Sequence, residues 1–235
     1  MDSARVLHWT EEALDQRNVV ALLHERMAEE TLEGALVVDA TAGNGHDTEF
    51  LARAVGASGE VLAIDLQASA VEATRRRLAG DPDLARRVRV IEGDHATLAD
   101  LTPTSWAGRV SLVVFNLGYL PGGSRAVTTR AGSSRAAAAA ALELLAPDGL
   151  LCMALYTGHP GGAEEAATLR AWSAEQASPR VRVHHIRDAG DGAAGRPEVL
   201  LIRRRAASNP QEDPPTIQHF EHEVPASDPD QGVAE

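Results

Sequence analysis

The chain has 235 residues, of which 44% are hydrophobic, and this is enough for one globular domain with a sizeable core. Its formal net charge of −12 argues against a nonspecific coat of nucleic acid, although a local basic rim on an acidic body is compatible with it. No apolar run reaches the roughly 18 residues of a membrane span, and the N-terminal residues lack the apolar region of a signal peptide. We therefore expect a cytoplasmic protein without membrane contact.

Short β-branched runs alternate with helical patterns along the chain. The region 4–30 predicts one or two helices, with Thr10 as a candidate N-cap. The pattern predicts further helices over 46–54, 69–78, 136–145 and 163–175. It predicts strands over 35–39, 61–65, 88–92, 110–115, 150–156, 181–186 and 198–203. This alternation is typical of an α/β doubly wound, mostly parallel sheet, with 198–203 either at an edge or as an antiparallel insertion.

The segment 206–235 has a different composition. It contains seven Asp or Glu, no Lys or Arg, and few apolar residues. Such a segment cannot bury enough apolar surface to offset the entropy of ordering it. We expect one domain over 1–205 and an acidic, disordered tail over 206–235.

The first predicted strand runs into a loop with two glycines. Glycine lets a backbone turn tightly and approach a ligand, because no Cβ intervenes. A dinucleotide site would require glycine also at Thr41 and Thr48. The pattern D-x-T-x-G-x-G, from Asp39 through Gly43 to Gly45, instead favours the first motif of S-adenosylmethionine-dependent methyltransferases. A plain tight turn is the alternative.

Acidic residues follow the next two predicted strands. Asp65 can accept both hydroxyls of a ribose, and Gln67 lies close enough in sequence to reach the same sugar or the adenine. Asp94, followed by His95, stands where a carboxylate commonly meets the exocyclic amine of adenine. A helix N-cap is the alternative for Asp94.

The run 116–123 follows the fourth predicted strand, beside the expected reactive end of the cofactor. Asn116 provides an uncharged acceptor for a target nitrogen, and Tyr119 offers an aromatic face to a base. Leu117 and Gly118 belong to the same run. The alternative is a tight turn with Tyr119 in the core.

Two further features lie near this run. His159 is a candidate for proton transfer or a phosphate contact, with a solvated loop histidine as the alternative. Arg125 and Arg130 could bind phosphates at the mouth of the site, although a solvated charge run explains them equally well. The histidines lack zinc-like spacing, so we predict no metal site.

Four segments together resemble a known family: D-A-T-A-G-N-G-H-D-T at 39–48, F-N-L-G-Y-L-P-G-G at 115–123, T-T at 128–129 and G-H-P-G-G at 158–162. They resemble the small class I methyltransferases that are labelled rRNA methylases. The resemblance implies a Rossmann-like sheet of seven strands, S-adenosylmethionine as methyl donor and a tRNA anticodon stem-loop as substrate. Bacterial members look like enzymes that convert 5-aminomethyl-2-thiouridine at the wobble position to its methylaminomethyl form.

The resemblance also implies roles for individual residues. With the glycine loop, the expected cofactor contacts are Asp39, Thr41, Gly43, Asn44, Gly45, His46, Asp47, Asp65, Gln67, Asp94 and His95. The expected catalytic residues are Asn116, Tyr119 and His159. The expected substrate contacts are Leu117, Gly118, Arg125, Thr128, Thr129 and Arg130.

Three other functions stay open at this point. The same chemistry could act on rRNA or on a small-molecule amine. The chain could be an inactive module that only binds S-adenosylmethionine, or an NAD-dependent oxidoreductase, which Thr48 disfavours. The family resemblance also raises a homodimer, for which the sequence offers no separate support.

Overall fold

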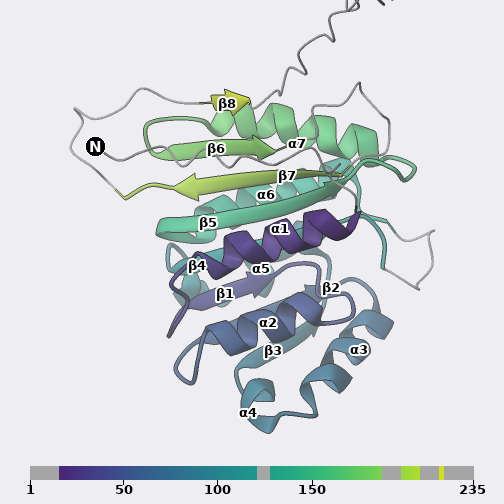
Figure 1. The fold of residues 1–235 in the computed structure, drawn as a ribbon, viewed down its shortest axis with the longest axis vertical. Coiled ribbons are helices and arrows are strands. Elements are labelled where there is room, and N and C mark those ends of the chain that lie inside the picture. The colour runs from purple at the N-terminus through teal and green to yellow at the C-terminus, as the bar shows by residue number, and fades with distance from the viewer. Residues whose placement is uncertain (1–15, 121–127, 187–196, 207–216, 220–235) are drawn as a thin grey trace, which may run out of the picture.

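The computed structural model describes residues 16–120, 128–186, 197–206 and 217–219 (Figure 1). One sheet contains the strands in the order β3-β2-β1-β4-β5-β7-β6-β8. The strands are β1 (Leu36–Asp39), β2 (Glu60–Asp65), β3 (Val88–Glu92), β4 (Val110–Leu117), β5 (Leu145–Tyr156), β6 (Val181–Ile186), β7 (Pro197–Arg204) and β8 (Ile217–His219). The α-helices are α1 (Gln16–Ala28), α2 (His46–Ala54), α3 (Ala68–Leu78), α4 (Pro82–Ala85), α5 (Leu98–Leu101), α6 (Ala131–Leu144) and α7 (Gly162–Gln176), and the 3₁₀ turns are η1 (His95–Thr97) and η2 (Thr104–Trp106).

The predicted seven strands all form, and β1 to β5 pair in parallel. β7 is the antiparallel insertion, because it pairs with β5 on one side and with β6 on the other. An eighth strand, β8, pairs in parallel with β6 and comes from the segment predicted to be a disordered tail. The rest of that tail and the candidate cap Thr10 lie outside the described residues.

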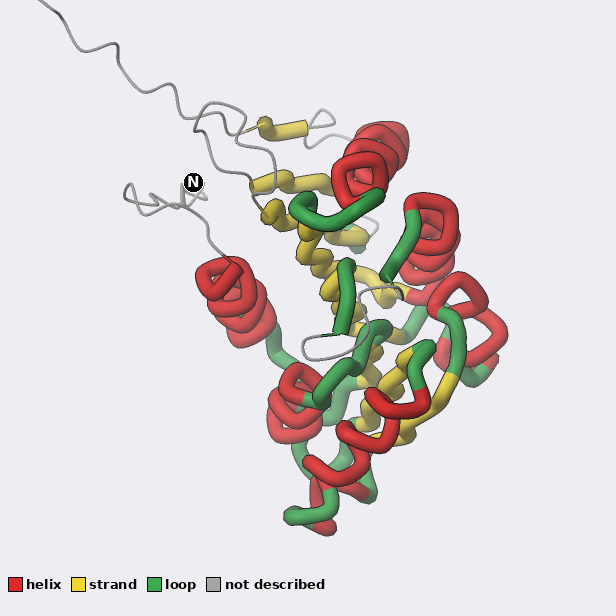
Figure 2. Tube along the Cα trace, turned by 90° about the vertical axis from the view of Figure 1, so that its right-hand side faces the viewer, coloured by secondary structure: helices red, strands yellow, loops and turns green. Residues whose placement is uncertain are grey.

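Helices cover both faces of the sheet, as the edge-on view in Figure 2 shows. One face packs against α1, α2, α3 and α4, and the other packs against α5, α6 and α7. The central strands are therefore buried on both sides, which explains why they are almost continuously apolar in sequence. Successive residues alternate between the two cores, with Val37, Leu112, Val114 and Cys152 on the α1 face and Val38, Val113, Phe115 and Met153 on the α6 face.

Helix α6 begins at Ala131, earlier than the predicted residue 136. The sequence Gly132-Ser133-Ser134 favours a loop, since these residues have low helix propensity. Tertiary contact overrides this preference, because the buried Ser134 hydroxyl donates to Glu165 of α7 at 2.5 Å. Helix α6 is therefore longer at its N-terminal end than predicted.

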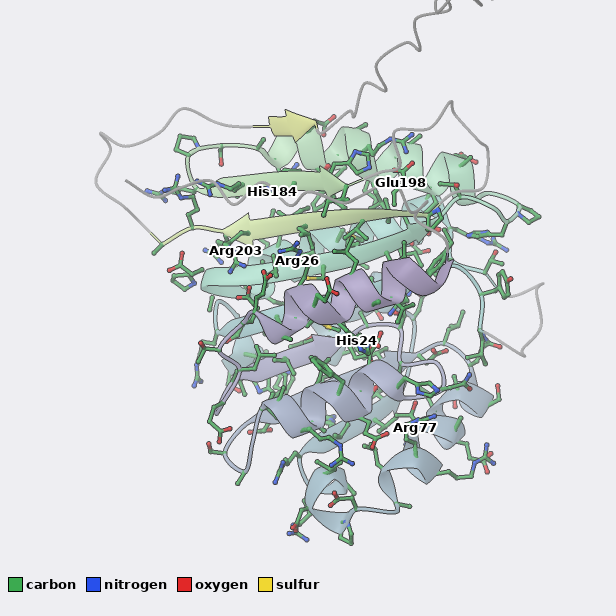
Figure 3. All side chains as sticks on the ribbon, in the orientation of Figure 1. His24, Arg26, Arg77, His184, Glu198 and Arg203 are labelled. Carbon is green, nitrogen blue, oxygen red and sulfur yellow. The ribbon has the colours of Figure 1, made fainter. Side chains whose placement is uncertain are left out.

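The N-terminal helix α1 packs on one face of the sheet, over β5 and β7. Arg203 of β7 pairs with Glu30, just beyond α1, at 2.5 Å, and His24 of α1 lies between α1 and α2 (Figure 3). The strand order reverses between β1 and β4, and a ligand crevice lies outside the carboxyl ends of the strands at such a switch point. Asp39 ends β1 and Asn116 lies near the end of β4, so both stand at that crevice.

Candidate active site

Asp39 anchors the loop that follows β1. Its side chain is fully buried, Oδ2 accepts from the Thr48 hydroxyl at 2.6 Å, and Oδ1 accepts from the Thr41 amide at 3.2 Å. Burial, together with the charge of Asp47, raises the pKa of Asp39 to about 7. Thr48, which occupies the glycine position of a dinucleotide fingerprint, thus ties α2 to the strand.

Two further contacts hold the loop between neighbouring strands. Thr41 Oγ1 accepts from the amide of Asn116 at 2.7 Å, and the amide of Gly43 donates to Asp65 Oδ2 at 2.9 Å. Gly45 has φ +78°, and a Cβ there would lie 2.9 Å from Thr74 Cα. This position therefore requires glycine for both conformation and space.

Asp65 lies at the end of β2 with both oxygens engaged by the backbone. Besides the Gly43 contact, Oδ1 accepts from the Gln67 amide at 2.9 Å. Each carboxylate oxygen has a second lone pair, so Asp65 can still accept from two ligand hydroxyls.

The pair Asp94 and His95 follows β3. Asp94 is exposed, and its Oδ1 accepts from the Ala96 amide at 2.8 Å, so the helix-cap interaction is formed. His95 is buried edge-on against Phe115, with ring centroids 6.1 Å apart. Burial lowers the pKa of His95, which favours the neutral ring.

Asn116 is oriented by a chain of side chains from α2 and α1. Its Nδ2 donates to Asp47 Oδ2 at 2.5 Å, and His24 Nε2 donates to Asp47 Oδ1 at 2.5 Å. The hydrogen bond to Asp47 raises the pKa of His24. The Oδ1 atom of Asn116 is buried and has no hydrogen-bond partner among the described residues. The remaining atom of this fixed amide is therefore an unused acceptor near the carboxyl end of β4.

His159 is buried rather than solvated. Its ring stands edge-on to that of Tyr119, with centroids 6.3 Å apart, and Tyr119 itself is half-buried. Beside it, the carboxylate of Glu165 is buried and accepts from the hydroxyls of Thr129 and Ser134. Thr128 forms a bridge with Tyr119 in the same turn.

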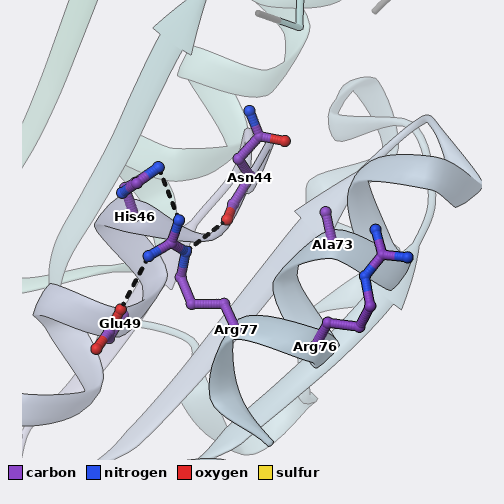
Figure 4. A pocket seen from close by; sticks show the side chains of 6 residues that line it. All are labelled: Asn44, His46, Glu49, Ala73, Arg76 and Arg77. Carbon is purple, nitrogen blue, oxygen red and sulfur yellow. Dashed lines mark hydrogen bonds and ion pairs between the residues drawn. The ribbon is translucent and has the colours of Figure 1, made fainter. Parts of the chain in front are cut away.

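The structure also places the other predicted site residues, some at the surface and one in the core. His46 is exposed and accepts from Arg77 at 2.8 Å, in an open hollow of about 570 Å³ between α2 and α3 that Asn44 also lines (Figure 4). The side chain of Leu117 is fully buried in the core, so it has no accessible surface for a substrate. Arg130 is exposed at the N-cap of α6, and Arg125 lies outside the described residues.

His24 and Glu165 were not found from the sequence. Both lie on helices and carry no motif, and only the tertiary packing brings them to the crevice. Within the described ranges, no three His, Cys, Asp or Glu side chains gather as metal ligands do. The helices of these ranges are all too short or too polar to cross a bilayer.

Comparison with known proteins agrees with this architecture. A family model described as "Putative rRNA methylase" matches residues 61–202, more than half of the chain. The chain belongs to this rRNA methylase family. The crystal structure of a putative rRNA-methylase from Clostridium thermocellum is similar to this chain. The two are 30% identical, with a TM-score of 0.74 over 83% of this chain and 100% of that one.

Two other proteins similar to this chain are informative. A putative methyltransferase from Streptococcus mutans, solved in complex with SAH, is 26% identical, with a TM-score of 0.68 over 79% of this chain and 97% of that one. A tRNA (mnm(5)s(2)U34)-methyltransferase of Arabidopsis thaliana, named as chloroplastic, is 36% identical over 149 residues, which are 60% of this chain. The match spans only 53% of that relative, about half of its length.

Proposed function

We propose that this chain is an S-adenosylmethionine-dependent N-methyltransferase that converts 5-aminomethyluridine, with or without the 2-thio group, at the tRNA wobble position to its methylaminomethyl form. The observation that carries the proposal is the unpartnered Oδ1 of Asn116, fixed by Asp47 at the crevice. The name of the plant relative and the SAH bound to the streptococcal one support the substrate and the cofactor.

The residues around the glycine loop fit S-adenosylmethionine. Asp65 retains acceptor capacity for a ribose, and Gly43 and Gly45 keep the loop free of side chains where it turns. Asp94 stands exposed at the end of the neighbouring strand. When bound, S-adenosylmethionine would supply an electrophilic methyl group carried on a sulfonium.

Asn116 then orients the methyl acceptor. Oδ1 accepts one N–H of the substrate amine, which fixes the direction of the nitrogen lone pair. Because a neutral primary amine is already nucleophilic, holding it in line provides most of the catalysis. Tyr119, half-buried beside the same turn, offers its ring to the base that carries the amine.

Incubation of the purified chain with tRNA tests this function. We expect nucleoside mass spectrometry to show methylaminomethyluridine on tRNA that carries the aminomethyl group, and no product on tRNA without it or on rRNA. Equal modification of rRNA or of unmodified tRNA would contradict the proposed substrate. If calorimetry shows that the chain binds S-adenosylmethionine but no amine is methylated, the chain is the inactive binding module. If calorimetry shows that it binds NAD instead, the chain is the oxidoreductase.

The tRNA anticodon stem-loop is the partner in this proposal. The homodimer and the cytoplasmic location stay predictions from the sequence. Light scattering of the purified chain, alone and with tRNA, measures the stoichiometry of both assemblies.

A further inference from the structure

The tautomer of the neutral His159 ring is set by a contact within its own loop. Nδ1 lies 3.1 Å from the carbonyl oxygen of Pro160. A carbonyl only accepts, so Nδ1 carries the hydrogen, and the Nε2 of the neutral ring has a bare lone pair. Nε2 is buried and has no hydrogen-bond partner among the described residues. The ring therefore presents an unused proton acceptor inside the protein.

A buried carboxylate faces that acceptor. Glu165 Oε2 lies 3.9 Å from His159 Nε2, and the two side chains are only 2% and 4% exposed. Oε1 accepts from Ser134 at 2.5 Å and Oε2 accepts from Thr129 at 2.7 Å. Both oxygens thus act as acceptors, as an ionised carboxylate does. A buried anion is costly without a cation, and a protonated His159 would provide one.

The bare Nε2 lies next to the turn that follows Asn116. β4 and β5 pair so that Asn116 is opposite Ala154, and His159 follows the end of β5. A Cβ on Gly118 would lie 3.8 Å from Nε2, so Nε2 packs close to the backbone of this turn. The proton acceptor and the amide acceptor therefore lie at the ends of adjoining strands.

The other titratable groups around the pair do not compete for the proton. His95 feels the charge of Glu165, but burial lowers its pKa. Tyr156, which also faces Gly118, has its pKa raised to about 12 by burial. Tyr119 meets the ring of His159 edge-on. The ring nitrogen that the structure places 3.9 Å from Glu165 Oε2 is Nε2 of His159.

We propose that His159 is the base that deprotonates the substrate ammonium and that Glu165 is a positioning residue that stabilises the protonated ring. This inference rests on the proposed function. One N–H bond of the ammonium breaks and its electron pair stays on nitrogen, while the proton forms a new bond to His159 Nε2. The charge that leaves the substrate is then held 3.9 Å from the Glu165 carboxylate.

The test compares Glu165→Gln and His159→Gln with a matched control, Glu164→Gln, which changes the exposed neighbour on the same helix. Methylation of aminomethylated tRNA is measured from pH 6 to pH 10. At pH 7 we expect kcat to fall on the order of 100-fold in His159→Gln and roughly 10-fold in Glu165→Gln, within the range of general-base catalysis. Both losses should shrink towards pH 10, where the amine is neutral without help. KM and the affinity for S-adenosylmethionine should stay within about two-fold.

A merely structural role gives a different pattern. A loss that is equal at all pH values, or full activity of Glu165→Gln, would overturn the proposal. Circular dichroism of each variant verifies folding. Glu165→Asp keeps the negative charge, so it should have a higher kcat than Glu165→Gln if the loss in Glu165→Gln comes from the missing charge. If Glu165→Asp has no higher kcat than Glu165→Gln and the loss of kcat is the same at all pH values, Glu165 acts only through packing.

A second measurement separates this inference from the proposed function. ¹⁵N NMR of the histidine rings in the free full chain reports which nitrogen of His159 carries the hydrogen at pH 8. We expect a protonated Nδ1 and a bare Nε2, and the opposite tautomer would overturn the base whatever the substrate is. If the NMR result is as expected but the parent does not methylate aminomethylated tRNA at any pH, the proposed function fails, and with it the assigned proton donor.

Discussion

The side-chain nitrogen Nδ2 of Asn116 and the carboxylate oxygen Oδ2 of Asp47 lie 2.5 Å apart, although 69 positions separate the two residues in the chain. The contact fixes which atom of the side-chain amide remains without a partner. Nδ2 is used by Asp47, so the free atom is the oxygen, and the site can accept a hydrogen bond from a substrate nitrogen without carrying a charge.

Replacement of Asn116 by Ala should abolish most turnover while the cofactor still binds. We expect kcat to fall on the order of 100-fold, because the amine loses the acceptor that orients it. The affinity for S-adenosylmethionine, measured by calorimetry, should change by less than about two-fold. Ser111→Ala on the same strand, away from its carboxyl end, is the control. A parallel loss of cofactor binding would mean that Asn116 holds the loop rather than the substrate.

His24→Ala should destabilise the fold in a pH-dependent way. The hydrogen bond to Asp47 raises the pKa of His24 above 6.5, so the native state binds this proton more tightly than the unfolded chain does. The contribution is complete below pH 6.5 and is lost as pH rises through the higher native value. Urea unfolding at pH 5.5 and pH 9 should therefore show a larger deficit of the variant at pH 5.5. His46→Ala, at an exposed histidine, is the comparison, and a deficit of equal size at both pH values argues against the ion pair.

Asp39→Asn should flatten the dependence of stability on pH. The native pKa of about 7 lies above the ordinary 3.8, so the parent loses stability as pH rises between these values. The loss is roughly 1.4 kcal/mol for each pKa unit of the shift. Unfolding free energies at pH 4.5 and pH 7.5 should differ less in the variant than in the parent. Identical differences in both proteins would show that Asp39 is ionised throughout.

Two glycine substitutions should have opposite effects. Gly45→Ala places a Cβ 2.9 Å from the Thr74 backbone at φ +78° and should cost about 2 kcal/mol or more. Gly132→Ala lies in α6 with no atom within 4 Å of the new Cβ and should stabilise by about 0.5 kcal/mol. Urea unfolding checks both. A Gly45→Ala protein as stable as the parent would show that α3 can move away from the loop at little cost.

Asp65→Asn should weaken cofactor binding. An amide presents one acceptor oxygen where the carboxylate presents two, and its NH₂ group would face either the Gly43 or the Gln67 amide. We expect at least about a ten-fold loss of affinity for S-adenosylmethionine, since hydrogen bonds to a charged acceptor are among the stronger ones. Glu60→Gln at the opposite, exposed end of the same strand is the control. Unchanged affinity would remove Asp65 from the cofactor site.

The sequence indicates strand ends well and helix surfaces poorly. β3 runs from Val88 to Glu92 as predicted, and Asp39, Asp65 and Asn116 stand at one sheet edge because the carboxyl ends of parallel strands meet there. Glu164 and Glu165 are chemically identical neighbours, yet only packing of α7 against α6 buries the second.

Two other features also depend on tertiary contacts. His24 comes from a helix whose sequence gives no reason to associate it with residue 47, and the pair forms only when α1 and α2 pack side by side. β8 arises from a polar segment and exists because the edge of β6 offers backbone partners. Local patterns of residues do not contain this information.

The single cysteine, Cys152, can report how often the centre of the sheet opens. It is the one thiol of the chain and lies fully buried in β5, between β4 and β7, where burial raises its pKa. A thiol reagent can react only when the centre of the sheet opens, because the thiolate is the reactive form and both faces are covered. The rate at which a thiol reagent labels the unmodified protein therefore measures how often β5 separates from its neighbours β4 and β7.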